Sequence, residues 1–208
     1  MGFLNDSCEF DELNEELHNE LVGLDCKPEP KIEQFFRDEC VLSDSQMLSH
    51  TYCFYEEVKN GDTIEKHAVA GFCVSSSNVA TKFIPKSTRN KINRKIPYEK
   101  QRDHYPAVMI GQLTVFDDYA RQGLGDELLD IIKFWVVEET QSVASRYLIV
   151  DAVNTEKVLN YYTRNGFMFA FPDEKLEREY VGVKESEKLR TRFMLCDLMP
   201  IMKAIREM

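Results

Sequence analysis

Two closely spaced glycines stand where an apolar stretch gives way to a helical pattern. The segment Arg121-Gln-Gly-Leu-Gly125 follows the apolar residues 107–116, and apolar side chains then recur at Leu128, Ile132 and Trp135. Backbone N–H groups in such a loop and in the first helical turn lack partners within the helix, and they favour an anionic ligand. The glycines would let that ligand approach the backbone closely. The pattern predicts a pyrophosphate site, with a plain tight turn as the equally weighted alternative.

The two common nucleotide-binding motifs do not fit this loop. Asp126 follows Gly-Leu-Gly, so the third glycine of the dinucleotide-binding fingerprint is missing. The Gly-Lys-Ser/Thr sequence of a phosphate-binding Walker loop is absent from the chain. The sequence therefore favours a different class of pyrophosphate ligand.

Cysteine and histidine spacing indicates neither a metal site nor a covalent intermediate. The six cysteines form no C-x-x-C pair and the four histidines are dispersed, which argues against zinc. Cys73 and Cys196 have no neighbouring histidine in the sequence that would indicate an acyl-enzyme. We expect reduced, mostly buried thiols and no metal.

Composition indicates one ordinary globular domain, residues 1–208, in the cytoplasm. Hydrophobic residues make up 43% of the 208-residue chain and charged residues 30%. No apolar run reaches membrane-spanning length, and the first residues lack a signal-peptide pattern, so we expect no membrane partner. The net charge of −10 is uneven, because residues 9–39 are strongly acidic whereas residues 82–102 are basic. Solvated faces explain both runs best, and phosphate or nucleic acid is the alternative at the basic one.

The periodicity predicts a mixed α/β sheet. We expect helices up to about residue 50 and a hairpin of strands 47–58 and 66–74 around Asn60-Gly61. An irregular basic insert that holds a short helix is expected at 82–106. A strand at 107–116, a helix at about 123–139, a strand at 146–152 and a helix at 155–164 follow. Strands are expected at 167–171 and 192–198, and the polar residues 172–190 are expected to form a loop.

This order, with two motifs, resembles the GNAT superfamily of acyl-CoA-dependent N-acyltransferases. The first motif is Gln112-Leu-Thr-Val115 with Arg121-Gln-Gly-Leu-Gly-Asp126. The second is Val150-Asp-Ala-Val-Asn154 with Val158-Leu-Asn-Tyr-Tyr-Thr-Arg-Asn-Gly-Phe167, and the match covers residues 52–171. The resemblance implies a mostly antiparallel sheet flanked by helices, with central parallel strands splayed apart. The first fifty residues and the basic insert are similar to a bacterial branch that includes toxin-like acetyltransferases, although such toxins often carry Arg at the position of Gln112.

The resemblance also implies a coenzyme site. The backbone of Leu113, Thr114 and Val115 would pair with the pantetheine arm of acetyl-CoA, as an added strand does. The pyrophosphate would be held by backbone N–H groups of the loop, namely those of Arg121, Gln122, Gly123, Leu124, Gly125 and Asp126. We expect the Asp126 and Glu127 carboxylates to face away from it.

The resemblance makes Tyr162 the general acid that protonates the leaving thiolate. Tyr161 and Tyr162 point about 100° apart on a helix, and the register to Gly166 predicts Tyr161 in the core and Tyr162 at the site. Asn154 would contact pantetheine, or cap the following helix. Asp117 and Asp118 are expected to be solvated turn residues, and the sequence identifies no general base.

The leading hypothesis is direct transfer of an acetyl group from acetyl-CoA to a primary amine of a small molecule or protein. The first alternative is toxin-like acetylation of aminoacyl-tRNA, in which Arg89, Lys91, Arg94 and Lys95 hold RNA phosphates. The second alternative is a non-catalytic CoA-binding protein. A homodimer is left open as the assembly.

Overall fold

A computed structural model describes residues 2–139, 143–184 and 186–207. Eight strands are hydrogen-bonded in the order β1-β3-β4-β5-β6-β8-β7, and β2 pairs with β4. The pairings β1 with β3, β3 with β4, β6 with β8 and β7 with β8 are antiparallel, and that of β2 with β4 is parallel. This confirms the predicted mixed, mostly antiparallel sheet. The splay of the central strands stays a prediction. The strands are β1 Glu9–Glu12, β2 Leu21–Val22, β3 His50–Asn60, β4 Thr63–Ala80, β5 His104–Val115, β6 Tyr147–Val153, β7 Met168–Phe169 and β8 Thr191–Asp197.

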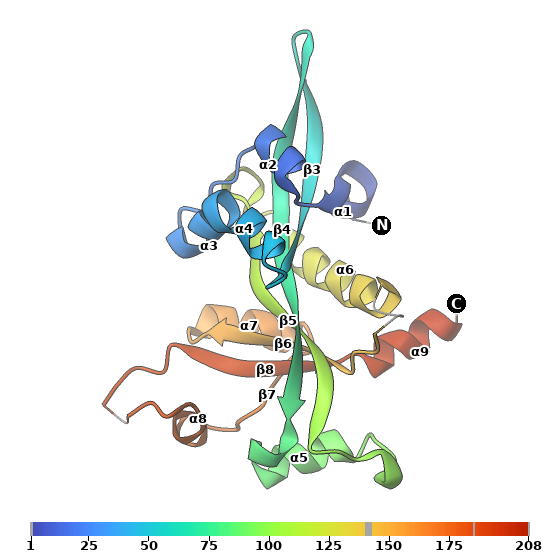
Figure 1. Cartoon of the computed structure of the whole chain (residues 1–208), viewed down its shortest axis with the longest axis vertical. Coiled ribbons are helices and arrows are strands. Elements are labelled where there is room, and N and C mark those ends of the chain that lie inside the picture. The colour runs from blue at the N-terminus through green and yellow to red at the C-terminus, as the bar shows by residue number, and fades with distance from the viewer. Residues whose placement is uncertain (1, 140–142, 185, 208) are drawn as a thin grey trace. The chain divides into compact units, whose positions relative to one another are not determined.

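The helices of the described residues flank these strands (Figure 1). None of them is long and apolar enough to cross a bilayer. They are α1 Phe3–Ser7, α2 Glu15–Glu20, α3 Pro30–Gln34, the π-helix Phe35–Glu39, α4 Cys40–Ser45, α5 Lys86–Asn93, α6 Leu124–Glu139, α7 Glu156–Arg164, α8 Glu174–Val181 and α9 Met199–Glu207. Short 3-10 turns occur at Thr81–Phe83, Tyr98–Lys100 and Asp117–Tyr119.

The chain divides into two compact units. Unit 1 contains residues 1–75 and 110–132, and unit 2 contains residues 76–109 and 133–208. In unit 1, β3 and β4 form the predicted hairpin, which is visible as two long paired strands in Figure 1 and turns at Gly61 with φ +63°. An added Cβ at Gly71 would lie 2.6 Å from the Phe36 ring, so this glycine lets the helical segment pack directly on β4.

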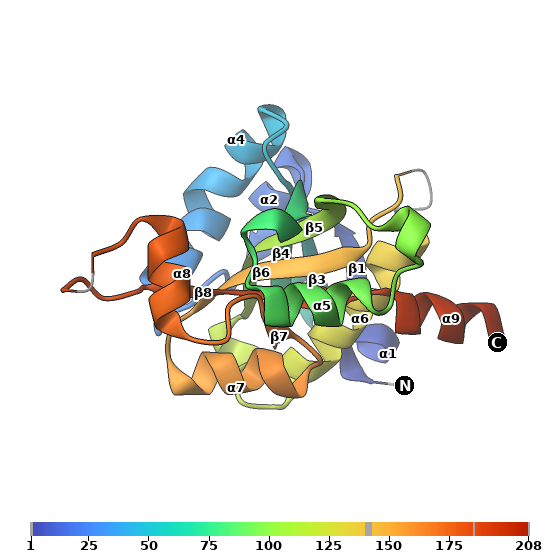
Figure 2. The same ribbon diagram turned by 90° about the horizontal axis from the view of Figure 1, so that it is seen from below.

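The core of unit 2 lies between its strands and its helices. β6 pairs with β8 from Tyr147 opposite Asp197 to Val153 opposite Thr191. α8 packs against β8 and is seen beside the strands in Figure 2. Buried side chains of this core are Val79, Ile84, Ile92, Tyr105, Ala107, Tyr147, Ile149, Ala170, Phe171 and Leu195.

The sequence prediction of secondary structure is wrong or incomplete at four places. Residues 9–12 form a strand rather than a helix, because Phe10 stacks on Phe54 at 4.5 Å. The expected loop 172–190 contains α8, which begins where the Asp173 side chain accepts from Leu176 N and ends at Gly182 in the left-handed region. Helix α9 was not predicted, and the strand expected at 167–171 is limited to two residues.

Candidate functional site

The backbone of the Arg121–Gly125 loop in unit 1 forms a tight turn that could surround an anionic group. Arg121 (φ +66°) and Gly123 (φ +83°) are both left-handed, so the chain reverses direction directly before α6. Residues 121–123 are exposed, and an added Cβ at Gly123 would meet nothing within 4 Å. The Asp126 N–H is bonded to the Gly123 carbonyl at 3.3 Å, which closes the first turn. The space above the glycine is therefore open to a ligand.

The predicted pantetheine strand is the last part of β5. Leu113 and Val115 are half-buried, whereas Thr114 is buried. The Thr114 hydroxyl lies 3.2 Å from Cys26 Sγ and donates to the Val115 carbonyl. These contacts hold the strand end at the point where the chain turns toward the loop.

Carboxylates near the loop are engaged elsewhere. Glu127 Oε1 accepts from Leu4 N at 2.9 Å, so its charge is directed toward the N-terminal segment, in line with the expected orientation. Asp117 Oδ2 accepts from Lys27 N at 3.2 Å. The carboxylates of Glu127 and Asp117 are therefore engaged in hydrogen bonds to backbone N–H groups rather than directed at a phosphate in the loop.

Asn154 of unit 2 directly follows β6 but does not cap α7. Its side-chain amide donates to Glu174 Oε1 at 2.9 Å and to the Leu189 carbonyl at 3.0 Å. Thr155 is the residue at the helix cap position. The capping alternative is therefore wrong, and the amide instead ties the strand end to α8 and to the segment before β8.

Tyr162 lies on α7, which ends where Gly166 (φ +87°) reverses the chain. The expected core position of Tyr161 is wrong, because Tyr161 is half-buried, whereas Tyr162 is 6% exposed. The Tyr162 ring packs edge-on against Phe167 at 5.2 Å. Burial raises the pKa of the Tyr162 phenol above its ordinary value, so it is neutral at physiological pH.

The structure brings together the predicted residues in two groups. The strand end and the loop belong to unit 1, whereas Asn154 and Tyr162 belong to unit 2. Assembly of the two groups into one site stays a prediction.

Sequence reasoning missed Asp151 of β6. This carboxylate lines a cavity of about 530 Å³ in unit 2, together with residues of four strands and of α8. Its only signal in the sequence is that it is the one acidic residue of the otherwise apolar run 146–152.

Within the described residues, one set of side chains could in principle ligate a metal: Glu12, Asp44 and His50, which are at least partly exposed. His50 Nδ1 lies 2.7 Å from Asp44 Oδ1 and 3.2 Å from Glu12 Oε1. Hydrogen bonds of a histidine to two carboxylates account for this arrangement.

Several solved structures are similar to this chain in architecture. A KacT mutant in which a tyrosine is replaced by phenylalanine is similar with a TM-score of 0.67 and 18% identity, over 96% of this chain and 99% of KacT. AtaT complexed with acetyl-methionyl-tRNAfMet is similar with a TM-score of 0.67 and 17% identity, over 96% of this chain and 99% of AtaT. AtaTR bound with AcCoA is similar with a TM-score of 0.64 and 17% identity, over 96% of this chain and 99% of the matched chain. The chain has a GNAT-like fold. No protein-family model matches the sequence, and no curated protein matches it.

Proposed function

We propose that the chain is an acetyl-CoA-dependent N-acetyltransferase. The observation that carries the proposal is the open, glycine-bearing turn before α6, in a fold similar to that of AtaTR bound with AcCoA. Backbone N–H groups of residues 121–126 would bind the pyrophosphate, and the backbone of residues 113–115 would pair with the pantetheine arm.

Tyr162 is the proposed general acid. A buried phenol with a raised pKa stays protonated until the thiolate leaves, and can then donate its proton to the sulfur. The ring contact with Phe167 fixes the direction of the side chain. KacT and AtaT were each also solved with a tyrosine replaced by phenylalanine, which fits an important tyrosine in those proteins.

Asn154 supports the coenzyme only as an acceptor of hydrogen bonds. Both protons of its side-chain amide are already donated, to Glu174 and to Leu189. A side-chain amide has two donors and one acceptor oxygen, so Oδ1 is the atom left for a ligand N–H. A pantetheine amide N–H has the required chemistry.

Of the proposed acceptors, aminoacyl-tRNA is favoured over a small amine or a protein amine. AtaT binds acetyl-methionyl-tRNA, which is an acetylated aminoacyl-tRNA. In this chain, Lys91, Arg94 and Lys95 are exposed on and just after α5. Such a basic segment suits RNA phosphates despite the acidic character of the whole chain.

A product assay tests the proposal. The protein is incubated with acetyl-CoA and one acceptor at a time: charged tRNA, peptides or small amines. The release of CoA and the mass of the product are measured in each mixture. We expect a mass increase of one acetyl group on the charged tRNA. Acetylation of peptides or small amines alone would remove the tRNA assignment, and binding of acetyl-CoA without turnover would favour the non-catalytic alternative.

A further inference from the structure

The cavity of unit 2 has a floor made by the sheet, with three apolar side chains and one serine. Its floor is contributed by four adjacent strands, through Ser77 of β4, Met109 of β5, Ile149 of β6 and Phe193 of β8. Tyr180 of α8 forms part of the opposite wall. A volume of about 530 Å³ accommodates a group of the size of an amino acid side chain with its backbone atoms.

One carboxylate faces this floor without a partner. Asp151 follows Ile149 on the same face of β6, opposite Phe193 of β8. Within the described residues, no hydrogen bond or ion pair of its carboxylate is found. A carboxylate beside apolar side chains suits a ligand that carries a positive charge next to an apolar group.

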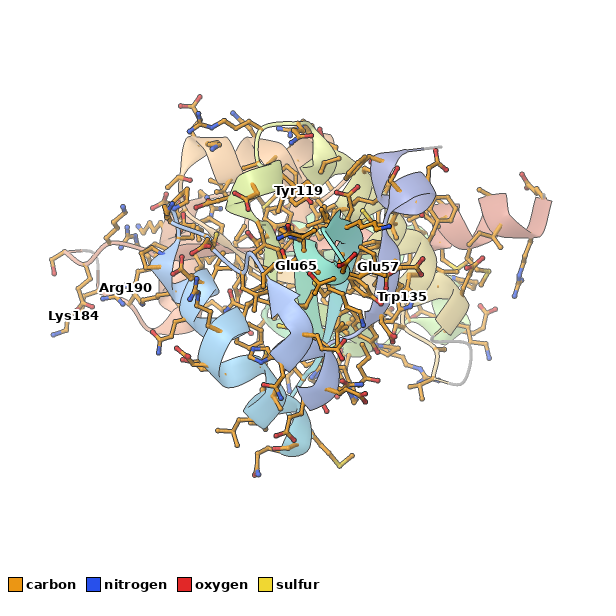
Figure 3. The ribbon with its side chains drawn as sticks, turned by 90° about the horizontal axis from the view of Figure 1, so that it is seen from above. Glu57, Glu65, Tyr119, Trp135, Lys184 and Arg190 are labelled. Atoms are coloured by element: carbon orange, nitrogen blue, oxygen red, sulfur yellow. The ribbon has the colours of Figure 1, made fainter. Side chains whose placement is uncertain are left out.

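The other ionisable groups around the cavity are either paired or at its rim. They are Glu177 and Tyr180 of α8, Glu187, Lys188 and Arg190 of the segment before β8, and Arg192 of β8. Glu177 accepts from Arg192 Nε and from Phe193 N, both at 2.5 Å, so its oxygens are occupied. Lys188 and Arg190 are exposed, and Figure 3 shows Lys184 and Arg190 projecting outward from this segment. The exposed groups at the rim are two cations, Lys188 and Arg190, and one carboxylate, Glu187, so the rim carries a net positive charge around the acidic centre. This arrangement favours a ligand with a buried ammonium and an outer phosphate.

We infer that this cavity takes the aminoacyl part of the acceptor, with an apolar side chain, and that Asp151 binds its α-ammonium and accepts its proton. The inference rests on the proposed function. Desolvation by the surrounding protein raises the pKa of Asp151, which strengthens it as a base, although its side chain stays open to solvent through the cavity.

The protons balance along this route. Asp151 takes one proton from the ammonium and releases it to solvent, which leaves a neutral amine. The amine nitrogen then forms a bond to the thioester carbon as the carbon–sulfur bond breaks. Tyr162 gives its proton to the thiolate and regains one from the nitrogen of the new amide. The products are the acetylated acceptor and free CoA, with one proton released.

The variant Asp151→Asn tests the inference, with Glu179→Gln as the matched control. Glu179 is an exposed carboxylate of α8 outside the cavity lining. Turnover of methionyl-tRNA and binding of methionine methyl ester by titration calorimetry are measured for each protein, with the Kd of acetyl-CoA as a check on folding. For Asp151→Asn we expect KM and the ester Kd to rise by about tenfold or more, with the acetyl-CoA Kd unchanged within about twofold. Asp151→Glu should recover part of the loss, and the acidic limb of the pH profile of kcat/KM should change in Asp151→Asn only.

A second variant tests the cavity without touching the charge. Ser77→Phe adds a bulky ring to the cavity floor from β4. Relative to the unchanged protein, we expect this variant to lose more affinity for methionine methyl ester than for the smaller glycine methyl ester. If Asp151→Asn and Ser77→Phe bind both esters as the unchanged protein does, the inference is wrong, even if acetyl transfer occurs. Absence of turnover in the unchanged protein, with Asp151-dependent ester binding, would instead remove the proposed function and keep the cavity assignment.

Discussion

Arg192 Nε donates to Glu177 Oε2 at 2.5 Å, and both side chains are buried. The second oxygen of Glu177 accepts from Phe193 N, and Arg192 Nη2 donates to the Phe171 carbonyl. Each charge is thus fully matched inside unit 2. Because removal of one partner leaves the other charge buried and unpaired, Glu177→Ala should lower the free energy of unfolding by about 3–5 kcal/mol. Urea denaturation measures this value.

The control for the ion pair is an exposed one. Asp25 pairs with Arg37 at 2.6 Å while both side chains are nearly half exposed. Asp25→Ala should change the free energy of unfolding by less than about 1 kcal/mol. Equal decreases in the free energy of unfolding for Glu177→Ala and Asp25→Ala would show that the buried Glu177 pair stabilises the protein no more than the exposed pair does.

Tyr162→Phe should lower kcat by about 10²–10⁴-fold and leave the Kd of acetyl-CoA unchanged, because only the proton donor is removed. Tyr161→Phe removes a hydroxyl from the adjacent, half-buried ring and should retain kcat within about threefold. Stopped-flow or steady-state CoA release separates the two variants. Similar rates for both would mean that the acid lies elsewhere.

Gly123→Ala should weaken acetyl-CoA binding, since it strains a left-handed turn and puts a methyl group where the phosphate approaches. The matched control is Gly61→Ala at the hairpin turn, where φ is also positive and the surrounding space is also open. Both variants should lose about 1 kcal/mol of stability, whereas only Gly123→Ala should raise the Kd, by about tenfold. Titration calorimetry that finds equal Kd values would contradict the loop assignment.

Replacing Arg89, Lys91, Arg94 and Lys95 by Gln should weaken tRNA binding most at low salt. Four lost phosphate contacts would reduce the slope of log K against log salt by up to about 3.6. Lys95 also lies 3.4 Å from Asp197 and Arg89 is half-buried, so the measured reduction should be smaller than this limit. Replacement of Lys31, Lys59, Lys203 and Arg206, which removes the same charge, is the control. An unchanged slope would exclude the basic segment as an RNA contact.

The cysteines should react slowly in the folded protein. Burial raises the pKa of Cys40 to about 11 and that of the half-buried Cys8 to about 12, and the reactive species is the thiolate. At pH 8 the thiolate fraction of Cys40 is on the order of 0.1%. A colorimetric thiol reagent should therefore detect six thiols only after denaturation, and fast reaction of several native thiols would contradict this prediction.

The central elements were predictable because their patterns are local. The helix after Gly123 carries regular apolar spacing, the strand at residues 147–153 is an almost continuous apolar run, and Gly166 marks the end of α7. Helix α8 escaped prediction because its buried position is an acid, Glu177, whose partner Arg192 lies 15 residues further along the chain. A contact of that kind leaves no periodic apolar signal.

The site residues were predicted less completely. Helical geometry gives the angle between Tyr161 and Tyr162 but not which ring is buried: Tyr161, expected in the core, is half-buried, whereas Tyr162 is buried. Asp151 was overlooked because it stands within an apolar strand, where its neighbours dominate the pattern. Its surroundings come from β4, β5 and β8, which are distant in sequence.

Each compact unit is built from two separate stretches of chain, and both β4 and β5 run through the point where one unit gives way to the other. Neither unit can be encoded by one uninterrupted gene fragment. A protease cut at residue 75 or 109 would sever a continuous strand rather than a linker. Dividing this protein to study coenzyme and acceptor recognition separately would therefore require circular permutation or co-expression of paired fragments.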